Sequence, residues 1–257
     1  MLILGLLVGG FVGFAAGYLG SIMISKRMAL VGDALSHVAL PGLALGILFG
    51  FNPFLGAFAF LAVTAVITWY LQKSTVLPVE SIIGVLFVLA LALGILITPQ
   101  VDLLEALFGD INTVTTSDVI ATSVISVLVV LLLRTIYSKL ALTMISRELA
   151  VSNRINVDGI NLLYLLLVST VVAVGIKEVG TLLVGAVVIV PAAAARNLSS
   201  SLSRFSLLSG LFGVVSAVAG IIISGYLGLP AGPVVVLAGA ALFIIGLGAK
   251  FTHLARG

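Results

Sequence analysis

The sequence predicts an all-α polytopic membrane protein with eight or nine transmembrane helices. Composition is the first reason: 61% of the 257 residues are hydrophobic and 8% are charged, whereas a soluble domain carries about 25% charged residues. The second reason is that the apolar runs are continuous, and most are near the roughly 20 residues of helix that cross a bilayer. A transmembrane β-strand would instead alternate apolar and polar residues over about 10 positions. A soluble or disordered chain is excluded.

Nine apolar runs are candidate spans. The seventh is short and closely follows Lys177 and Glu178, so the alternative is eight spans plus a broken or re-entrant helix. The first run lacks the basic start and the cleavage site of a secretory signal peptide, so we interpret it as a span. We interpret residues 1–257 as a single transmembrane domain. The runs are 2–25, 28–50, 53–72, 79–98, 117–137, 159–176, 180–195, 205–227 and 232–250.

The basic residues predict the orientation, because cytoplasmic loops retain Lys and Arg. With the N-terminus outside and nine alternating spans, Lys177 is the only one of the twelve basic residues that falls outside. The loop at 99–116 carries Asp102, Glu105 and Asp110 and no Lys or Arg. We therefore expect the N-terminus outside, the C-terminus inside and the segment at about 138–158 in the cytoplasm.

Glycines recur every four residues in the first two runs. Small residues at this spacing let membrane helices approach closely, so we expect two packing faces. The first consists of Gly5, Gly9, Gly13 and Gly17, and the second of Gly42, Gly46 and Gly50.

Asp33 and His37 are the strongest candidates for chemistry. They lie four residues apart inside a predicted span, so a helix places them on one face, with Pro41 continuing that face and predicted to kink the helix. Placing an ionisable side chain within the membrane costs free energy, so such a residue is interpreted as functional unless something else explains it. A carboxylate and an imidazole suit Zn²⁺, Mn²⁺ or Fe²⁺, but they make only half a site, which a second copy of the chain would complete. The alternative is that the two side chains bond each other or cap a neighbouring helix.

Enzyme motifs are missing from the sequence. Neither His37 nor His253 is followed by Glu, which excludes the H-E-x-x-H zinc protease motif, and there is no P-loop and no cysteine. Asp33 is the only aspartate in the interior of a predicted span, because Asp118 stands at the start of one, whereas an intramembrane aspartyl protease needs two. Nothing in the sequence indicates nucleic-acid binding. We therefore expect a chain that is not an enzyme.

The longest predicted inner segment contains a short amphipathic stretch that begins at Ser146. We expect a small helix at the membrane face, either a plain connector or a docking helix for a cytoplasmic partner. The candidate docking residues are Arg147, Glu148, Leu149 and Ala150.

The stretch from Arg27 to Gly42 closely resembles the signature of the permease subunits of ATP-binding-cassette importers for zinc, manganese and iron. Ala194 stands where members of that family often have Thr. Further similar segments are Leu103–Asp110 (outer loop), Arg147–Gly159 (cytoplasmic coupling segment), Val179–Val184 with Val190–Arg196 (late-helix motif) and Leu229–Pro233 (last outer turn).

The resemblance implies a homodimer in a prokaryotic plasma membrane, with each copy docked on a cytoplasmic ATPase that carries the ATP. An extracytoplasmic binding protein would deliver Zn²⁺, Mn²⁺ or Fe²⁺, and Asp33 and His37 would face the translocation path. Pro41, Gly42 and Pro191 would serve helix kinking and packing. Which metal is carried stays open. The alternatives are an ATP-independent metal or proton transporter or channel, an intramembrane enzyme, or a permease for chelated iron or vitamin B12.

Overall fold

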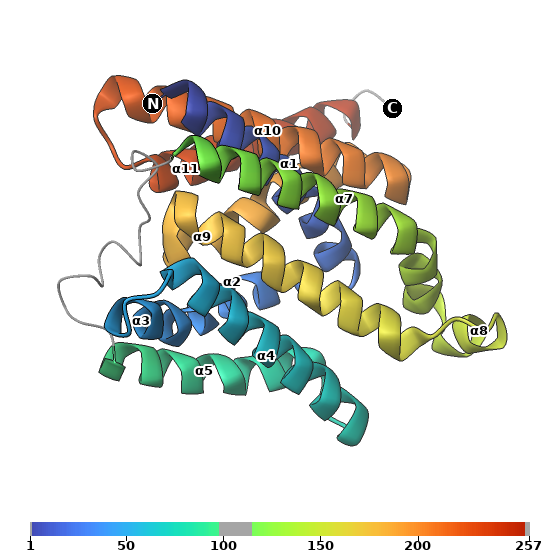
Figure 1. Cartoon of the computed structure of the whole chain (residues 1–257). Helices are drawn as coiled ribbons and strands as arrows, with labels where there is room; N and C mark the ends of the chain where they lie inside the picture. The colour runs from blue at the N-terminus through green and yellow to red at the C-terminus, as the bar shows by residue number, and fades with distance from the viewer. Residues whose placement is uncertain (1, 98–114, 255–257) are drawn as a thin grey trace.

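The structure is a computed structural model that describes residues 2–97 and 115–254, and every regular element in these ranges is a helix (Figure 1). The predicted acidic outer loop, with Asp102, Glu105 and Asp110, lies outside the described residues. The helices are α1 (Leu2–Ser25), α2 (Ala29–Val38), α3 (Leu40–Leu48), α4 (Pro53–Ser74), α5 (Val79–Ile97), α7 (Thr116–Ile145), α8 (Arg147–Ser152), α9 (Val157–Arg196), α10 (Leu202–Leu227) and α11 (Ala231–Leu254).

Local sequence signals explain where several helices begin and end. Asn52 caps α4 by accepting a hydrogen bond from the backbone N–H of Phe54 at 2.9 Å. Thr115 and Asp118 form a reciprocal capping box at the start of α7. Such side chains satisfy backbone donors that the first turn of a helix leaves unpaired. The helix α10 ends at Gly228, whose φ of 64° is the left-handed conformation that glycine adopts at little cost.

Within the described ranges, eight helices are long and apolar enough to cross a membrane, and Leu183–Arg196 is a shorter apolar helix. This matches the alternative of eight spans plus a broken element. The break lies at Gly180, whose φ of 76° and ψ of 170° are not helical, so α9 is two helices joined at a kink. The second span, Ala29–Leu48, consists of α2 and α3, which join at Ala39, whose φ of −70° and ψ of −22° are still helical. Within the described residues, the chain is thus an integral membrane protein with a broken helix, α9.

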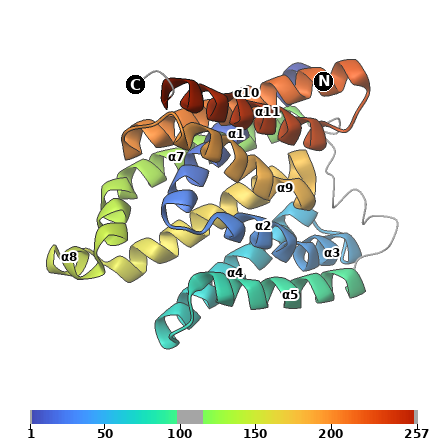
Figure 2. The ribbon, with the colours of Figure 1, turned by 180° about the vertical axis from the view of Figure 1, so that it is seen from behind.

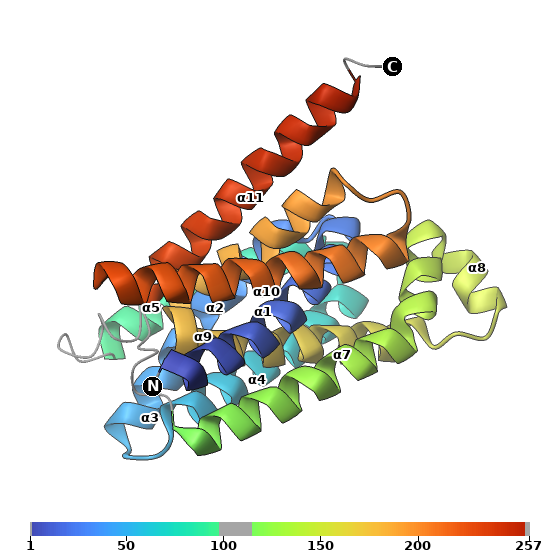
Figure 3. The ribbon, with the colours of Figure 1, turned by 90° about the horizontal axis from the view of Figure 1, so that it is seen from above.

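The helix α9 lies between two groups of helices and contacts both (Figures 1 and 2). On one side, α1 packs against α10 and α7, and α11 packs against α10 and α9. On the other side, α2, α3, α4 and α5 pack against one another. Seen from above, α11 crosses α10 and extends away from the other helices (Figure 3). The main hydrophobic core follows this plan, with Leu19, Leu35, Leu61, Leu133 and Tyr164 fully buried in it.

The bundle has two ends. The end that carries α8, called the α8 end below, also holds the turn from α1 to α2 and the end of α4 (Figure 1). The opposite end holds the start of α1, the turn from α3 to α4 and the start of α7. Because α1 begins at the opposite end and α11 runs toward the α8 end, the first and last helices run in the same direction (Figures 1 and 3).

The segment between α7 and α9 is shorter than predicted. The prediction placed it at about 138–158, but α7 continues to Ile145 and α9 begins at Val157. The helix α7 extends beyond the predicted apolar run of 117–137 because no helix-breaking residue occurs before Ser146. Leu140, in this extension, is buried in the core. What remains between the two long helices is essentially α8 and its two caps.

The predicted glycine ridge of α1 is a close packing contact. A Cβ atom built on Gly13 would lie 2.5 Å from the carbonyl oxygen of Gly213 in α10, and one on Gly17 would overlap the carbonyl of Ser209. Gly42 similarly meets the backbone of Gly56 and Ala57 in α4. Gly50 does not belong to the second ridge as predicted. It lies in the turn after α3 with a φ of 67° and no atom within 4 Å of the added Cβ, because the chain reverses there.

Gly13 offers a direct test of this packing. We expect Gly13→Ala to lower the free energy of unfolding by about 1–3 kcal/mol, because the added methyl group meets backbone that cannot move aside without separating α1 from α10. Gly10→Ala is the matched control on the same helix, since its Cβ would meet nothing within 4 Å. Thermal unfolding in detergent measures both variants. Equal midpoints for the two would contradict the packing role.

Candidate metal site and docking helix

Asp33 and His37 lie on a face of α2 that the other described helices leave partly uncovered. The helix buries Val31, Leu35 and Val38, while Asp33 is exposed and His37 is half-buried. Leu30, one turn before Asp33, has 81% of its surface exposed. Lipid can cover an apolar side chain such as Leu30, but a carboxylate that faces lipid is costly, so the exposed Asp33 favours a face that lipid does not cover.

Two other helices fix the surroundings of this pair. Gly185 in the second half of α9 lies against the backbone of Asp33, where an added Cβ would lie 2.6 Å from the Asp33 Cα. The ring of His37 lies 5.6 Å from the ring of Phe87 in α5, centroid to centroid. No hydrogen bond joins Asp33 to His37 within the described ranges, and the buried His37 Nδ1 has no partner there. The pair is therefore held in place by packing, with the Asp33 side chain exposed and the His37 Nδ1 enclosed and unpaired within the described residues.

A single chain does not supply a complete metal site in the part that the structure describes. No group of three or more His, Cys, Asp or Glu side chains comes close enough there to hold an ion. Asp33 and His37 together offer at most one carboxylate and one imidazole. Any tighter coordination therefore needs ligands from outside the described chain, which agrees with the half-site expected from the sequence.

The predicted amphipathic segment is the helix α8. Ser146 caps it by accepting a hydrogen bond from the N–H of Leu149 at 3.2 Å. Glu148 is exposed, and Leu149 has 51% of its surface exposed. Ala150 is fully buried within the chain, so it anchors α8 and does not belong to the predicted docking surface. Val151, which the sequence analysis did not select, is 58% exposed and adds an apolar side chain.

The residues predicted to kink or pack helices have defined positions. Pro41 lies in the first turn of α3, directly after the junction with α2 at Ala39. Gly42 is buried in the contact with α4. Pro191 lies inside the second half of α9 and is also buried.

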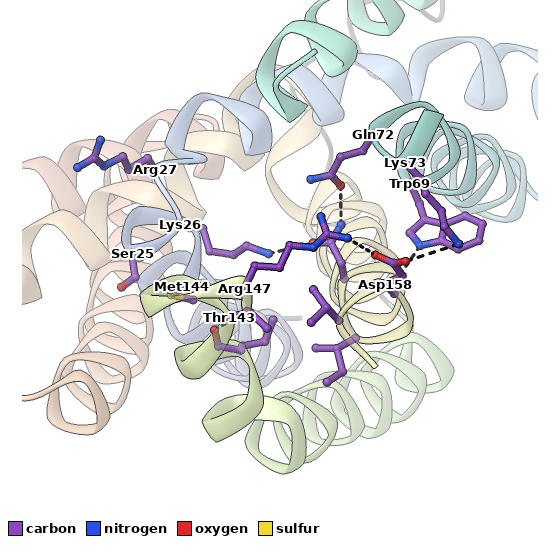
Figure 4. A pocket seen from close by; sticks show the side chains of 14 residues that line it. Ser25, Lys26, Arg27, Trp69, Gln72, Lys73, Thr143, Met144, Arg147 and Asp158 are labelled. Carbon is purple, nitrogen blue, oxygen red and sulfur yellow. Dashed lines mark hydrogen bonds and ion pairs between the residues drawn. The ribbon is translucent and has the colours of Figure 1, made fainter. Parts of the chain in front are cut away.

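The structure also contains a polar pocket that the sequence analysis did not predict (Figure 4). It has a volume of about 500 Å³ and lies at the α8 end between α1, α4, α7 and α9. Lys26 Nζ donates to Asn161 Oδ1 at 3.0 Å, and Asn161 Nδ2 donates to Gln72 Oε1 at 2.6 Å. Burial lowers the pKa of the Lys26 ammonium to about 8, because removal from water disfavours the charged form.

A second polar group in the pocket is centred on Asp158. Arg147 donates to Asp158 Oδ1 at 3.0 Å, and Lys73 Nζ lies 3.5 Å from Asp158 Oδ2. The indole N–H of Trp69 donates to the backbone carbonyl of Asp158 at 2.9 Å. These residues come from three helices, α4, α8 and α9, and α4 is distant in sequence from the other two. Only the basic character of the segments was therefore visible beforehand.

The fold and the candidate sites together define a multi-pass helical membrane protein with an intramembrane Asp–His pair and a small helix exposed at one end. The chain belongs to the ABC 3 transport family, which it matches over residues 1–250.

Several known proteins are similar to this chain over most of their length. It is 33% identical over 238 residues to the manganese transport system membrane protein MntC of Listeria innocua, covering 91% of this chain and 85% of MntC. It is 30% identical over 247 residues to the high-affinity zinc uptake system membrane protein ZnuB of Haemophilus influenzae, covering 94% and 95% of the two chains. Among solved structures, PsaBC from Streptococcus pneumoniae in complex with Fab matches with a TM-score of 0.83 and 32% identity, over 94% of this chain and 89% of that chain.

Proposed function

We propose that the chain is the membrane-spanning permease of an ATP-driven importer of divalent transition-metal ions, namely Mn²⁺, Zn²⁺ or Fe²⁺. The observation that carries this proposal is the Asp33–His37 pair, with Asp33 exposed and His37 half-buried, inside a span of an ABC 3 family member. The names of similar proteins, which are manganese transport and zinc uptake membrane proteins, support the same class of cargo.

In this proposal two copies of the chain form a homodimer, and α2 faces the two-fold axis. Asp33 and His37 of one copy then lie beside Asp33 and His37 of the other. The four side chains form a binding site in which each carboxylate supplies one oxygen ligand and each imidazole one nitrogen ligand. The two carboxylates offset the charge of a divalent cation, and the mixed ligands suit Zn²⁺, Mn²⁺ or Fe²⁺. Gly185 lets α9 press against the backbone of Asp33 and so fixes the carboxylate. A site shared by two chains opens when they separate, which suits release as well as binding.

Energy comes from another subunit in this proposal. The sequence has no P-loop, so ATP binds a cytoplasmic ATPase, and the permease itself is not an enzyme. The helix α8 is the contact with that ATPase, through Glu148 and Leu149. Arg147 contributes the part of its side chain that stays exposed while the guanidinium bonds Asp158. An extracytoplasmic binding protein delivers the metal at the opposite end. The assembly lies in the plasma membrane of a prokaryote, with residues 1–257 as one permease domain.

The orientation that follows places the N-terminus outside and the C-terminus and α8 in the cytoplasm. After residue 150, we expect a reporter that works only in the cytoplasm to be active and one that works only outside the membrane to be inactive. At the N-terminus we expect the reverse. The reason is that the basic residues gather at the α8 end. Paired reporters that work on opposite sides of the membrane measure this. An exported reporter at residue 150 would refute both the orientation and the ATPase docking.

The function itself is tested by measuring accumulated metals. Cells that express the permease with its ATPase and binding protein should accumulate Mn, Zn or Fe above cells that lack the permease, as measured by elemental analysis. Removing the ATPase should abolish the gain, whereas an ATP-independent transporter or channel would retain it. The proposal is contradicted if cells with all three subunits accumulate no more metal than cells that lack the permease.

A further inference from the structure

The basic pocket at the α8 end has a charge that its own residues do not balance. Figure 4 shows Lys26 and Arg147 directed into the pocket, whereas the guanidinium of Arg27 points away from its centre. Lys73 is the third cation at the rim, and Asp158 is the carboxylate that pairs with Lys73 and Arg147. Three cations and one carboxylate leave two positive charges unbalanced. Such a surface repels a divalent metal ion, so the pocket is separate from the proposed metal path.

Lys26 is the least compensated of these cations. In the part of the chain that the structure describes, its ammonium contacts only the Asn161 side-chain oxygen at 3.0 Å and the face of the Tyr164 ring at 4.3 Å. Neither is a full negative charge, and the side chain is largely removed from water. Burying a cation without an anionic partner is costly, and the lowered pKa of Lys26 reflects this cost. An anion in the pocket would remove it.

The donors around the pocket suit a tetrahedral anion. The Lys26 ammonium has donors left after its bond to Asn161, and the Arg147 guanidinium has donors left after its bond to Asp158. Gln72 uses its oxygen to accept from Asn161, which leaves its amide NH₂ to donate, and that group points into the pocket in Figure 4. A phosphate group carries a charge of about −1.5 to −2 and three strong acceptor oxygens. It therefore matches the unbalanced charge, whereas a lone carboxylate would neutralise only half of it.

We propose that this pocket is a binding site for a phosphate group, with Lys26, Arg147 and Gln72 as its donors and Lys73 as the cation at its rim. The pocket lies where α1, α4 and α7 end and α9 begins, which is the depth of the lipid head groups if these helices cross the bilayer. Basic pockets between membrane helices at this level hold anionic head groups. A soluble phosphate compound would present the same chemistry. The inference goes beyond metal transport and does not depend on it.

Thermal unfolding of the purified full chain tests the proposal. In neutral detergent at constant ionic strength, inorganic phosphate in place of chloride should raise the unfolding midpoint by about 3 °C. Reconstitution into discs of phosphatidylcholine with phosphatidic acid, whose head group is a phosphate monoester, should give a similar rise when compared with discs of phosphatidylcholine alone. A rise only in the anionic discs identifies a lipid head group as the source, and a rise with free phosphate identifies a soluble ligand. Either result supports the site.

Variants separate the pocket from general charge effects. Lys26→Gln should remove most of the rise, and Lys73→Gln provides a second pocket variant if the first does not fold. Lys139→Gln is the matched control, because Lys139 is exposed on α7 and does not line the pocket. The same rise in all variants, or no rise with either phosphate source, would overturn the proposal. The proposal would also be overturned if the unfolding midpoint rose only when the ATPase subunit was added and not with either phosphate source, because the cations would then serve protein docking.

The rise should also weaken with increasing pH. Lys26 loses its proton near pH 8 in the folded chain but near pH 10.5 when unfolded, so the protein without ligand gains stability between these values. The phosphate-dependent rise should therefore be large at pH 7 and small at pH 9, although phosphate itself is more negative at pH 9. The charged groups that face Lys26 are Lys73 from α4, Arg147 from α8 and Asp158 from α9. A rise that is constant from pH 7 to pH 9 would show that Lys26 is not the main donor.

Discussion

Asp33→Asn should reduce metal uptake at least tenfold. The substitution keeps the size of the side chain but replaces one accepting oxygen with a donating NH₂ group. It also removes the negative charge that offsets a divalent cation where the effective dielectric constant is low. In a homodimer this one substitution removes both carboxylates from the proposed metal-binding site. His37→Gln should have a smaller effect, because it removes a neutral ligand. Accumulated metal, measured in cells that express the complete transporter, is the readout.

Controls separate lost chemistry from lost folding. Asp33 is exposed in the single chain and is not needed for the hydrophobicity of its span, so Asp33→Asn should insert normally and bind the ATPase. Glu80→Gln removes an exposed carboxylate at the start of α5 and should leave uptake unchanged. Normal uptake by Asp33→Asn would refute the proposed metal-binding site. An experimental structure of the dimer with Asp33 facing lipid would refute it as well.

Replacing Glu148 and Leu149 together with Ala should abolish coupled transport while membrane insertion stays normal. The helix α8 has six residues, so its contact with a partner groove involves few side chains and is easily lost. Alanine keeps the helix, and the buried Ala150 still anchors it to the bundle. Transport and copurification of the ATPase should both fall at least tenfold. ATPase activity should no longer respond to the metal-loaded binding protein.

The turn between α4 and α5 offers a matched control. Leu77 in this turn and Glu80 in the first turn of α5 are exposed at the same end of the bundle. Leu77 has 52% of its surface exposed, compared with 51% for Leu149. Replacing both with Ala removes the same two chemical groups and should leave transport intact. Unchanged transport in the Glu148 and Leu149 double variant would make α8 a plain connector. Equal loss in both double variants would show that docking is not specific to α8.

Much of the fold could be predicted from the sequence because the signals are local. A bilayer accepts a helix when about 20 consecutive residues are apolar, and this property can be read residue by residue. It located the spans, including the short seventh element after Lys177 and Glu178. The stretch from Arg27 to Gly42, together with further segments that resemble other parts of the same family, indicated the family, which the match over residues 1–250 confirms. Asp33 and His37 stood out because few ionisable residues lie in the spans.

What the sequence could not decide depends on contacts between distant residues. Gly50 and Gly42 share the same spacing pattern, yet one lies in an open turn and the other against α4. Ala150 and Leu149 are neighbours, yet one is buried and the other exposed. Gly185 meets the backbone of Asp33, and Asn161 meets Lys26, across well over one hundred positions of sequence. The physical reason is that hydrophobicity and helix capping are properties of short segments, which determined the class and the spans. Coverage of one helix face by another is a property of pairs of segments, so the tertiary structure alone decided the exposure of Asp33 and the assembly of the basic pocket.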